Sequence, residues 1–461
     1  MAPKFGTSGL RGLVVELTPN LIASYTRAFL ASCPHGGAVH VGRDLRASSP
    51  ALAQTVLKTV TGAGLAAVDH GVLPTPALAL AAGTAGQAAI MITGSHIPAD
   101  RNGLKFYRPD GEIGKADEAA ILAACETAPP PAPAPGTLQQ SAEALRAYAA
   151  RYLDAFGPSA LAGLRVGVYE HSSVARDVLG DVLEGLGAEV VRLARSETFI
   201  PVDTEAVDPE TRTQLSDWCR DHGLDALVST DGDADRPMVT DAAGRIVPGD
   251  VLGPLTARSL AAAVICTPVS SNTLVDAMQG FTQVRRTKIG SPFVIAAMEE
   301  TAGARVVGYE ANGGFLLGFA AEGPAGPLAP LMTRDCLLPI LAPLATARAA
   351  GQPLADVVAA LPARFTAADR IAGIETDRSR AFLEQLTDSP EARRGFFDGR
   401  AAEAGVDLTD GLRLTFADGT IIHLRPSGNA PEFRCYAEAD SPDRAEALMR
   451  ETLQAVADRL G

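Results

Sequence analysis

Residues 164–193 read LRVGVYEHSSVARDVLGDVLEGLGAEVVRL, and this stretch contains the pattern from which the fold is predicted. Residues 164–169 are typical of a buried strand, and a helical stretch follows that ends near two glycines at 185 and 187. Residues 188–193 are strand-like again. Strands that alternate with helices at this spacing indicate a βαβ unit with parallel pairing. The segment therefore predicts an α/β domain.

Two other windows repeat this order of signals. Residues 38–42 are strand-like and precede a helical stretch that closes near Gly62 and Gly64. Residues 263–267 are strand-like and precede a helix that runs to about Gly280. Three such windows predict three α/β domains with mixed, mainly parallel sheets.

The end of the chain has a different pattern. Residues 412–416 and 421–424 are strand-like and flank the sequence ADGT at 417–420, which is a hairpin signal. Residues 432–437 supply another strand, and a final helix begins after Ser441. These signals predict an α+β domain with an antiparallel sheet. The domains expected along the chain are residues 1–150, 151–250, 251–365 and 366–461.

Length and composition are those of a soluble globular protein with several domains. The chain has 461 residues, of which 47% are hydrophobic and 20% charged. It has no uninterrupted apolar run of the roughly 18 residues that a membrane span needs, and its first residues lack the apolar region of a secretory signal, so we expect a cytoplasmic location. The 6 cysteines form no CxxC pair, which argues against a disulfide framework or a zinc site.

The net charge argues against nucleic acid or an anionic membrane as a partner. The chain has 40 basic and 54 acidic residues, which gives a formal net charge of −14. A strongly acidic protein is not attracted at long range to a polyanion. It can still bind a phosphate group where Arg, Lys and backbone N–H groups are clustered locally.

Ser95 is the first candidate for chemistry. It lies in the sequence TGSHIP at 93–98, directly after the apolar run 88–92. A serine in a glycine-containing turn at the carboxyl end of a strand faces a cleft in α/β domains. It can act as a nucleophile or carry a phosphate, although an ordinary turn has the same pattern.

Three carboxylates at alternate positions form the second candidate site. The sequence DGDADR at 231–236 follows the strand-like residues 227–230. Neighbouring carboxylates repel one another, and a hard cation such as Mg²⁺ relieves that repulsion through its preference for oxygen ligands. An EF-hand needs Gly at the sixth loop position and Glu at the twelfth, where this chain has Arg236 and Ala242. The alternative to a metal site is a solvated acidic turn.

Two glycine-containing loops complete the candidates. The sequence RPSGN at 425–429 combines a guanidinium, a hydroxyl, an amide and free backbone N–H groups, which suits an anion. The sequence GYEANGG at 308–314 places a carboxylate and an amide where they could bind sugar hydroxyls. A simple β-turn is the alternative for the first loop, and glycine-rich loops like the second are common.

Together these motifs resemble a known family. They occur in the order seen in the α-D-phosphohexomutases, over essentially the full length, and the sequence is most similar to the bacterial phosphomannomutase branch. The motifs are residues 5–12 (FGTSGLRG), 93–98 (TGSHIP), 231–236 (DGDADR), 310–312 (EAN) and 425–429 (RPSGN). The resemblance implies four domains around a central cleft, three of them α/β and the last α+β. It also implies an isomerase that moves a phosphoryl group within a hexose phosphate.

The resemblance implies a role for each catalytic candidate. Ser95 would carry the phosphate, and its oxygen would hold Mg²⁺ together with Asp231, Asp233 and Asp235. Arg236 would steady the transferring phosphoryl group. The implied reaction interconverts mannose 1-phosphate and mannose 6-phosphate through a hexose 1,6-bisphosphate, which also activates the enzyme. The residues implied to bind the hexose phosphate are Lys288, Gly290, Ser291, Glu310, Asn312, Arg425, Ser427, Gly428 and Asn429.

The resemblance also implies candidates for the proton carrier. Lys105 matches a family lysine and is predicted as the general acid or base, with a phosphate-binding cation as the alternative. His96 lies beside the nucleophile, and Arg11 would orient groups electrostatically. Several relatives carry a histidine shortly after the sugar-loop glutamate, where this chain has NGGF at 312–315. Sugar specificity is therefore left open by this loop.

Other activities remain compatible with the sequence. A phosphoglucomutase or phosphoglucosamine mutase would use the same site, and a Mg²⁺-dependent phosphatase would hydrolyse the phosphoserine instead of returning its phosphate to the sugar. A non-catalytic sugar-phosphate binder would be expected to lose the serine or one of the aspartates, and all four are present. We expect a monomer or a homodimer.

Overall fold

The computed structural model describes residues 3–6, 9–125, 134–301, 303–426 and 432–460. Its first sheet has the strand order β1-β2-β6-β5-β3-β4-β8, and β7 pairs with β6. The strands are β1 (Lys4–Phe5), β2 (Leu10–Leu13), β3 (Ala38–Arg43), β4 (Ala66–Val72), β5 (Ala88–Ile92), β6 (Arg101–Arg108), β7 (Gly111–Glu112) and β8 (Leu138–Gln140). The helices are α1 (Pro19–Ser32), α2 (Ser49–Gly62), α3 (Thr75–Ala85) and α4 (Lys115–Ala124).

The second and third sheets each have five strands. Their orders are β10-β9-β11-β12-β13 and β15-β14-β16-β17-β20, and β18 pairs with β19 in a separate ribbon. The second domain contains α5 (Glu143–Phe156), β9 (Arg165–His171), α6 (Arg176–Gly185), β10 (Glu189–Arg195), α7 (Pro209–His222), β11 (Ala226–Thr230), β12 (Pro237–Thr240) and β13 (Ile246–Val247). The third contains α8 (Gly249–Ser259), β14 (Val264–Pro268), α9 (Leu274–Ala277), β15 (Gln283–Thr287), α10 (Ser291–Glu299), β16 (Val306–Tyr309), β17 (Phe315–Leu317), β18 (Ala321–Glu322), β19 (Pro327–Leu328), β20 (Leu331–Asp335), α11 (Leu337–Ala350) and α12 (Leu354–Ala359).

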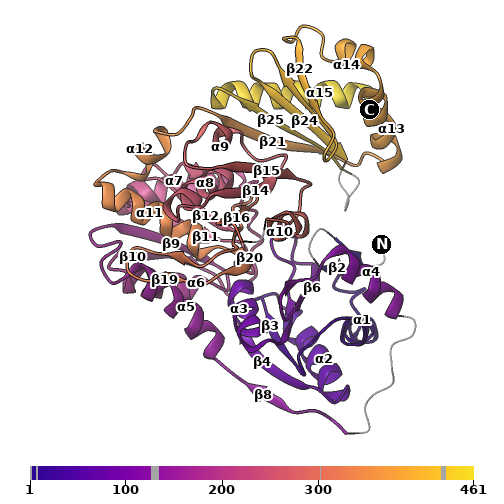
Figure 1. Cartoon of the computed structure of the whole chain (residues 1–461), viewed down its shortest axis with the longest axis vertical. Helices are drawn as coiled ribbons and strands as arrows, with labels where there is room; N and C mark the ends of the chain where they lie inside the picture. Colours follow the sequence, from indigo (N-terminus) through magenta and orange to yellow (C-terminus); the bar gives the residue numbers. More distant parts are fainter. Residues whose placement is uncertain (1–2, 7–8, 126–133, 302, 427–431, 461) are drawn as a thin grey trace.

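The C-terminal sheet is antiparallel throughout, in the order β21-β25-β24-β23-β22. It lies at one end of the molecule, at the top of Figure 1, and the first sheet lies at the other end. Its elements are β21 (Phe365–Ala372), α13 (Thr376–Asp388), α14 (Pro390–Phe396), β22 (Glu403–Asp407), β23 (Leu412–Phe416), β24 (Ile421–Pro426), β25 (Glu432–Ala439) and α15 (Pro442–Leu460). Three α/β domains and a final α+β domain confirm the predicted fold class.

Antiparallel pairing makes up a larger part of the first three sheets than the alternation of strand and helix signals in the sequence predicts. In the second sheet, β9 pairs with β10 and β11 in parallel, but β11 to β13 pair antiparallel. The third sheet repeats this division, with parallel β14–β16 and antiparallel β16–β17. The reason is local, because the short turn between β11 and β12 and the one between β16 and β17 return the chain as hairpins. These two turns hold the aspartate motif and the Glu310 motif.

One hydrophobic cluster extends across the first three domains, each of which also has a cluster of its own, whereas the fourth domain packs only around its own cluster. One buried cluster includes side chains of α3, α5, β9 and α11, among them Leu78, Tyr152, Val168 and Leu337. The fourth domain packs around a separate cluster that includes Phe382 and Phe433. Shared apolar packing fixes the loops of the first three domains relative to one another. None of the helices described here combines the length and apolar character that a bilayer crossing requires.

Two buried histidines make the stability of the fold sensitive to acid. His171 Nε2 lies 2.9 Å from the Thr230 carbonyl oxygen, His423 Nε2 bonds the carbonyl of Asp410, and both Nδ1 atoms are buried without a partner among the described residues. Burial lowers the pKa of each imidazole to about 4. Their unfolded pKa is about 6.5, so the unfolded chain binds more protons between these values and stability falls as the pH falls.

We therefore expect each histidine to cost about 1–2 kcal/mol of unfolding free energy between pH 7.5 and pH 5. Urea unfolding at both pH values measures this loss, and His423→Gln should remove about that much of it. His222, which is exposed, provides the control. If His423→Gln and His222→Gln change the pH dependence equally, burial of His423 is not its cause.

Candidate active site

Ser95 is held in an unusual backbone conformation at the end of β5. Its φ is 52°, in the left-handed region that residues with a Cβ rarely adopt. The conformation is supported on both sides, since the Ser95 amide donates to Thr93 Oγ1 at 2.7 Å and the Gly94 amide donates to Asp44 Oδ2 at 3.1 Å. Strain of this kind, worth about 1–3 kcal/mol, is typical of functional turns. Here it directs the serine hydroxyl toward the aspartate turn of the second domain.

Arg46 binds the backbone of the loop that carries Ser95. Its guanidinium donates to the carbonyl oxygens of Ser95 at 2.9 Å, Ile97 at 2.5 Å, Pro98 at 2.7 Å and Arg101 at 2.9 Å. The guanidinium carbon also lies 4.0 Å from the ring centroid of Phe199, in the second domain. Arg46 was not predicted from the sequence, because neither its spacing nor its neighbours form a motif.

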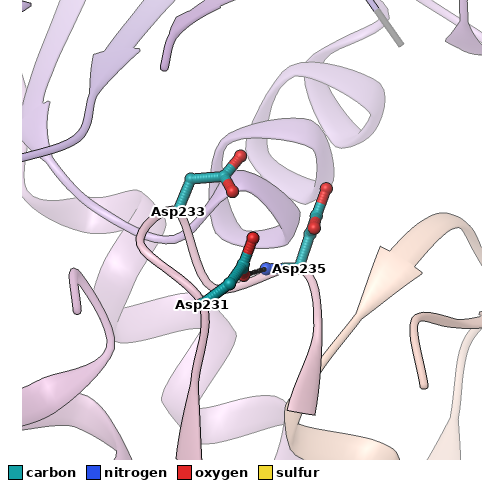
Figure 2. A group of neighbouring side chains, drawn as sticks. All are labelled: Asp231, Asp233 and Asp235. Atoms are coloured by element: carbon teal, nitrogen blue, oxygen red, sulfur yellow. Dashed lines mark hydrogen bonds between the residues drawn. The ribbon is translucent and has the colours of Figure 1, made fainter. Parts of the chain in front are cut away.

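The three aspartates form a tight cluster in the turn between β11 and β12. Asp231, Asp233 and Asp235 are all buried, and each offers one carboxylate oxygen within 4.8 Å of the others. Figure 2 shows the three carboxylates on the same side of the turn. The turn is closed by Asp231 Oδ1, which accepts from the backbone amides of Asp235 at 3.2 Å and Arg236 at 3.3 Å. The alternate spacing of the three aspartates in this turn therefore brings their carboxylates close together.

Lysine, threonine and arginine side chains donate hydrogen bonds to the Oδ2 atoms of Asp233 and Asp235. Lys105 Nζ donates to Oδ2 of both Asp233 and Asp235 at 2.5 Å. Thr75 donates to Asp233 Oδ2 at 2.7 Å, and Arg334 donates to Asp235 Oδ2 at 2.7 Å. The other oxygens, Oδ1 of both aspartates, are buried and have no hydrogen-bond partner among the described residues. Such unpaired buried oxygens are costly unless they bind a ligand.

The Ser95 hydroxyl oxygen lies beside the three carboxylates. Its hydroxyl donates to Asp231 Oδ2 at 2.5 Å across 136 positions of sequence. Burial raises the pKa of Asp231 well above its ordinary value, and the carboxylates of Asp233 and Asp235 add to the rise. A serine oxygen, a charged cluster and two unpaired carboxylate oxygens are the ligand chemistry that a hard divalent cation prefers. The residues therefore fit a magnesium ion.

Three other predicted catalytic residues contact the Ser95 loop or the aspartate turn. His96 Nδ1 lies 3.3 Å from Ser95 Oγ, and burial, aided by Arg236 and Arg11, lowers the pKa of His96 well below its ordinary value. Arg11 donates to the carbonyl of Gly94, and burial lowers its pKa to about 10. Arg236 Nε lies 3.9 Å from Asp235 Oδ1. Folding thus places His96 beside the Ser95 hydroxyl, Arg11 at the backbone of the same loop and Arg236 at the aspartate turn.

The predicted sugar loop, residues 308–314, is linked to the aspartate turn by Arg334. Glu310 and Asn312 follow β16 and are both buried. Arg334 Nη1 donates to Glu310 Oε2 at 3.3 Å, while its Nη2 contacts Asp235 as described above. Asn312 Oδ1 accepts from the Gly314 amide at 3.0 Å and so shapes the turn. Arg334 lies 24 positions after Glu310 and outside every motif, so it was not predicted from the sequence.

The predicted substrate loop at 288–291 contacts two other domains. Lys288 Nζ lies 6.0 Å from the ring centroid of Phe293. Gly290 has a φ of 128°, which explains the glycine before α10. Ser291 is fully buried and donates to Glu112 Oε2, in the first domain, at 2.9 Å. The structure therefore uses the Ser291 hydroxyl in a contact between domains.

Arg425 lies beside this loop although it belongs to the fourth domain. Its Nη1 is 3.7 Å from Asp410 Oδ2, and the same oxygen accepts from the Ile289 amide at 2.9 Å. Asp410 thus joins the predicted phosphate loop to the predicted substrate loop. Ser427, Gly428 and Asn429 lie outside the described residues.

The four domains of the chain match models of a known family. Four models named phosphoglucomutase/phosphomannomutase match in order, as alpha/beta/alpha domain I at residues 2–130, domain II at 146–244, domain III at 248–365 and the C-terminal domain at 355–455. The chain belongs to the phosphoglucomutase/phosphomannomutase family, and the resemblance inferred from its motifs is confirmed.

Two curated relatives carry a more specific name. A phosphomannomutase of Sinorhizobium fredii is 48% identical over 467 residues, covering 98% of both chains. A phosphomannomutase of Salmonella muenchen is 42% identical over 463 residues, covering 99% of this chain and 96% of its own. A solved phosphoglucomutase/phosphomannomutase family protein from Burkholderia thailandensis has the same fold, with a TM-score of 0.79, 22% identity and coverage of 99% of this chain and 98% of its own.

Proposed function

We propose that this enzyme is a phosphomannomutase that uses Ser95 as its phosphate carrier. The observation that carries the proposal is the 2.5 Å contact between Ser95 Oγ and Asp231 Oδ2, inside a cluster of three buried carboxylates. The similarity to two phosphomannomutases over nearly the whole chain supports mannose phosphates as the substrates.

The proposed reaction has two transfers with one reorientation between them. The P–O bond of phospho-Ser95 breaks as a new P–O bond forms to the 6-hydroxyl of mannose 1-phosphate. The hydroxyl loses its proton, and the product is mannose 1,6-bisphosphate. This bisphosphate turns over in the cleft, and its 1-phosphate returns to Ser95, which leaves mannose 6-phosphate. Externally added hexose 1,6-bisphosphate would activate the enzyme by phosphorylating Ser95.

The metal ligands in this proposal are Ser95, Asp231, Asp233 and Asp235. The Oδ1 atoms of Asp233 and Asp235, which are buried and have no hydrogen-bond partner among the described residues, support the assignment. A bound Mg²⁺ supplies charge neutralisation for the transferring phosphoryl group. The protein's own residues must then hold the sugar in line with the phosphoserine and exclude water, because a trapped water molecule would take the phosphoryl group.

The proton transfers are assigned to Lys105 and His96. Lys105 Nζ donates to two carboxylates at 2.5 Å, which uses two of the three N–H groups of an ammonium and leaves one for the substrate. This favours Lys105 as a proton donor or phosphate ligand. His96, whose pKa is lowered by burial, supplies a neutral ring nitrogen beside Ser95 that can accept a proton.

The remaining predicted residues are proposed to hold the part of the substrate that does not react. Glu310 and Asn312 would bind the sugar hydroxyls, and Arg425, Ser427, Gly428 and Asn429 would bind the distal phosphate. Lys288 and Gly290 would face the substrate between the groups that bind the sugar hydroxyls and those that bind the distal phosphate. The joint contact of Arg425 and Ile289 with Asp410 supports a common binding surface.

A coupled assay with Mg²⁺ and a trace of hexose 1,6-bisphosphate tests the substrate. We expect kcat/KM to be at least about tenfold higher for mannose 1-phosphate than for glucose 1-phosphate or glucosamine 1-phosphate, a difference that one hydroxyl contact can supply. Free inorganic phosphate should stay at background, since a phosphatase would release it. A much faster reaction with either of the other sugars would overturn the mannose assignment and leave the mutase reaction intact.

A further inference from the structure

The last three residues of β20, Thr333 to Asp335, lie where the first three domains meet. Thr333 donates to Glu112 Oε1, in the first domain, at 2.8 Å, and Glu112 also accepts from Ser291. The Asp335 carboxylate accepts from the hydroxyls of two buried tyrosines of α5, Tyr148 and Tyr152. The residues on both sides of Arg334 are therefore anchored, which fixes the backbone that carries its side chain.

Arg334 itself joins two loops that belong to different domains. It is 3% exposed. One terminal nitrogen donates to Asp235 in the aspartate turn at 2.7 Å, and the other donates to Glu310 in the sugar loop at 3.3 Å. A guanidinium holds its nitrogens in a rigid plane, so two bonds from one group set the separation of the two carboxylates.

The stem of Arg334 also depends on the sugar loop. A Cβ atom at Gly314 would lie 2.7 Å from Arg334 Cδ and 2.8 Å from Cγ. The loop thus carries a glycine where the arginine stem passes closely over its backbone. Packing and hydrogen bonding both tie Arg334 to the loop that contains Glu310.

We propose that Arg334 is a positioning residue that fixes the Glu310 carboxylate relative to the aspartate turn, and so aligns the sugar with Ser95. The proposal rests on the proposed function, in which Glu310 binds the sugar hydroxyls. Displacement of a substrate-binding group by about 1 Å can cost about 10²-fold in rate. Arg334 thus acts on the reaction through Glu310, without itself needing to touch the reacting atoms.

The first test is a double-mutant cycle between Arg334→Met and Glu310→Gln. We expect Arg334→Met to lower kcat/KM by about 10- to 100-fold, with changes in both kcat and KM. If Arg334 works through Glu310, the double variant should resemble Glu310→Gln alone. Arg334→Lys should recover only part of the loss, because one ammonium cannot replace the planar fork. Multiplicative effects in the double variant, or full activity of Arg334→Met, would overturn the proposal.

The second test measures binding without turnover. In a Ser95→Ala background, calorimetry should show that Arg334→Met weakens mannose 6-phosphate binding by about tenfold. Mn²⁺ affinity should change less than about threefold, because Lys105 still holds Asp235 Oδ2. A large loss of Mn²⁺ affinity with unchanged sugar affinity would assign Arg334 to the metal site and overturn the proposal.

The controls separate positioning from folding and from the proposed function. Arg393→Met removes another buried arginine, one that pairs with Glu403 at 2.7 Å in the fourth domain, and should leave kcat/KM unchanged. Thermal unfolding of each variant shows whether it is folded at the assay temperature. If the wild-type chain does not turn over mannose 1-phosphate, the proposed function fails. In that case, the cycle of Arg334→Met and Glu310→Gln, measured as binding of glucose 1,6-bisphosphate in the Ser95→Ala background, still decides the role of Arg334 by whether its effect depends on Glu310.

Discussion

Ser95→Ala is expected to lower the mutase rate by about 10⁴-fold or more, because the variant has no oxygen to carry the phosphoryl group between the two transfers. Ser95 is 1% exposed, and its hydroxyl already donates to the Asp231 carboxylate. Among the described residues, no other hydroxyl makes a hydrogen bond to the Asp231 carboxylate, since the Thr230 hydroxyl donates to the Asp231 backbone carbonyl oxygen. The coupled assay with mannose 1-phosphate measures the loss.

A phosphorylation measurement makes this prediction specific. Intact-mass spectrometry after incubation with hexose 1,6-bisphosphate should find one added phosphoryl group on the wild-type chain and none on Ser95→Ala. Ser379→Ala is a matched control, since Ser379 is also 1% exposed and its hydroxyl has no hydrogen-bond partner among the described residues. Full activity of Ser95→Ala, or a phosphoryl group that remains after the substitution, would contradict the proposed carrier.

Asp231→Asn is expected to weaken divalent-cation binding and to lower kcat by about 10²–10³-fold, since the metal supplies several kcal/mol of charge stabilisation. The amide keeps the Oδ1 acceptor that closes the turn toward Asp235 and Arg236, so the backbone should be preserved. Calorimetry with Mn²⁺ measures the affinity directly, and removal of metal by a chelator should reduce the wild-type rate to a similar level.

Asp241→Asn is the matched control for this substitution. Asp241 closes the next turn of the same domain in the same way, as its Oδ1 accepts from the backbone amides of Ala243 at 2.9 Å and Arg245 at 3.1 Å. It lies outside the aspartate cluster. We expect it to change stability but not Mn²⁺ affinity. Equal effects of the two substitutions on Mn²⁺ affinity would show that Asp231 is not a metal ligand.

Much of the fold could be predicted because its signals are local. The strand predicted at 164–169 corresponds to β9, and the following helix and strand correspond to α6 and β10. Apolar alternation and glycine positions depend only on near neighbours in the chain, so one sequence is enough to read them. The antiparallel halves of the sheets were harder to anticipate, because β12, β13 and β17 have only two to four residues.

The site was predictable where its residues form a contiguous motif. Ser95 and the three aspartates each lie in a short stretch whose chemistry can be inferred from residue types, and folding places them in contact. Arg46 and Arg334 were not predicted. Arginines are common in this chain, and nothing near either residue in sequence indicates that its guanidinium becomes buried against distant loops.

The sequence alone determined which chemical groups are available: a serine after a buried strand, three alternating carboxylates, and two glycine-containing loops that suit a sugar and a phosphate. Only the tertiary structure decided how they are combined. It places Asp231 against Ser95, directs Lys105 to Asp233 and Asp235, and inserts Arg334 between Asp235 and Glu310. These contacts span 24 to 136 positions of sequence, and they form because apolar burial in the shared core of the first three domains brings the strand ends together.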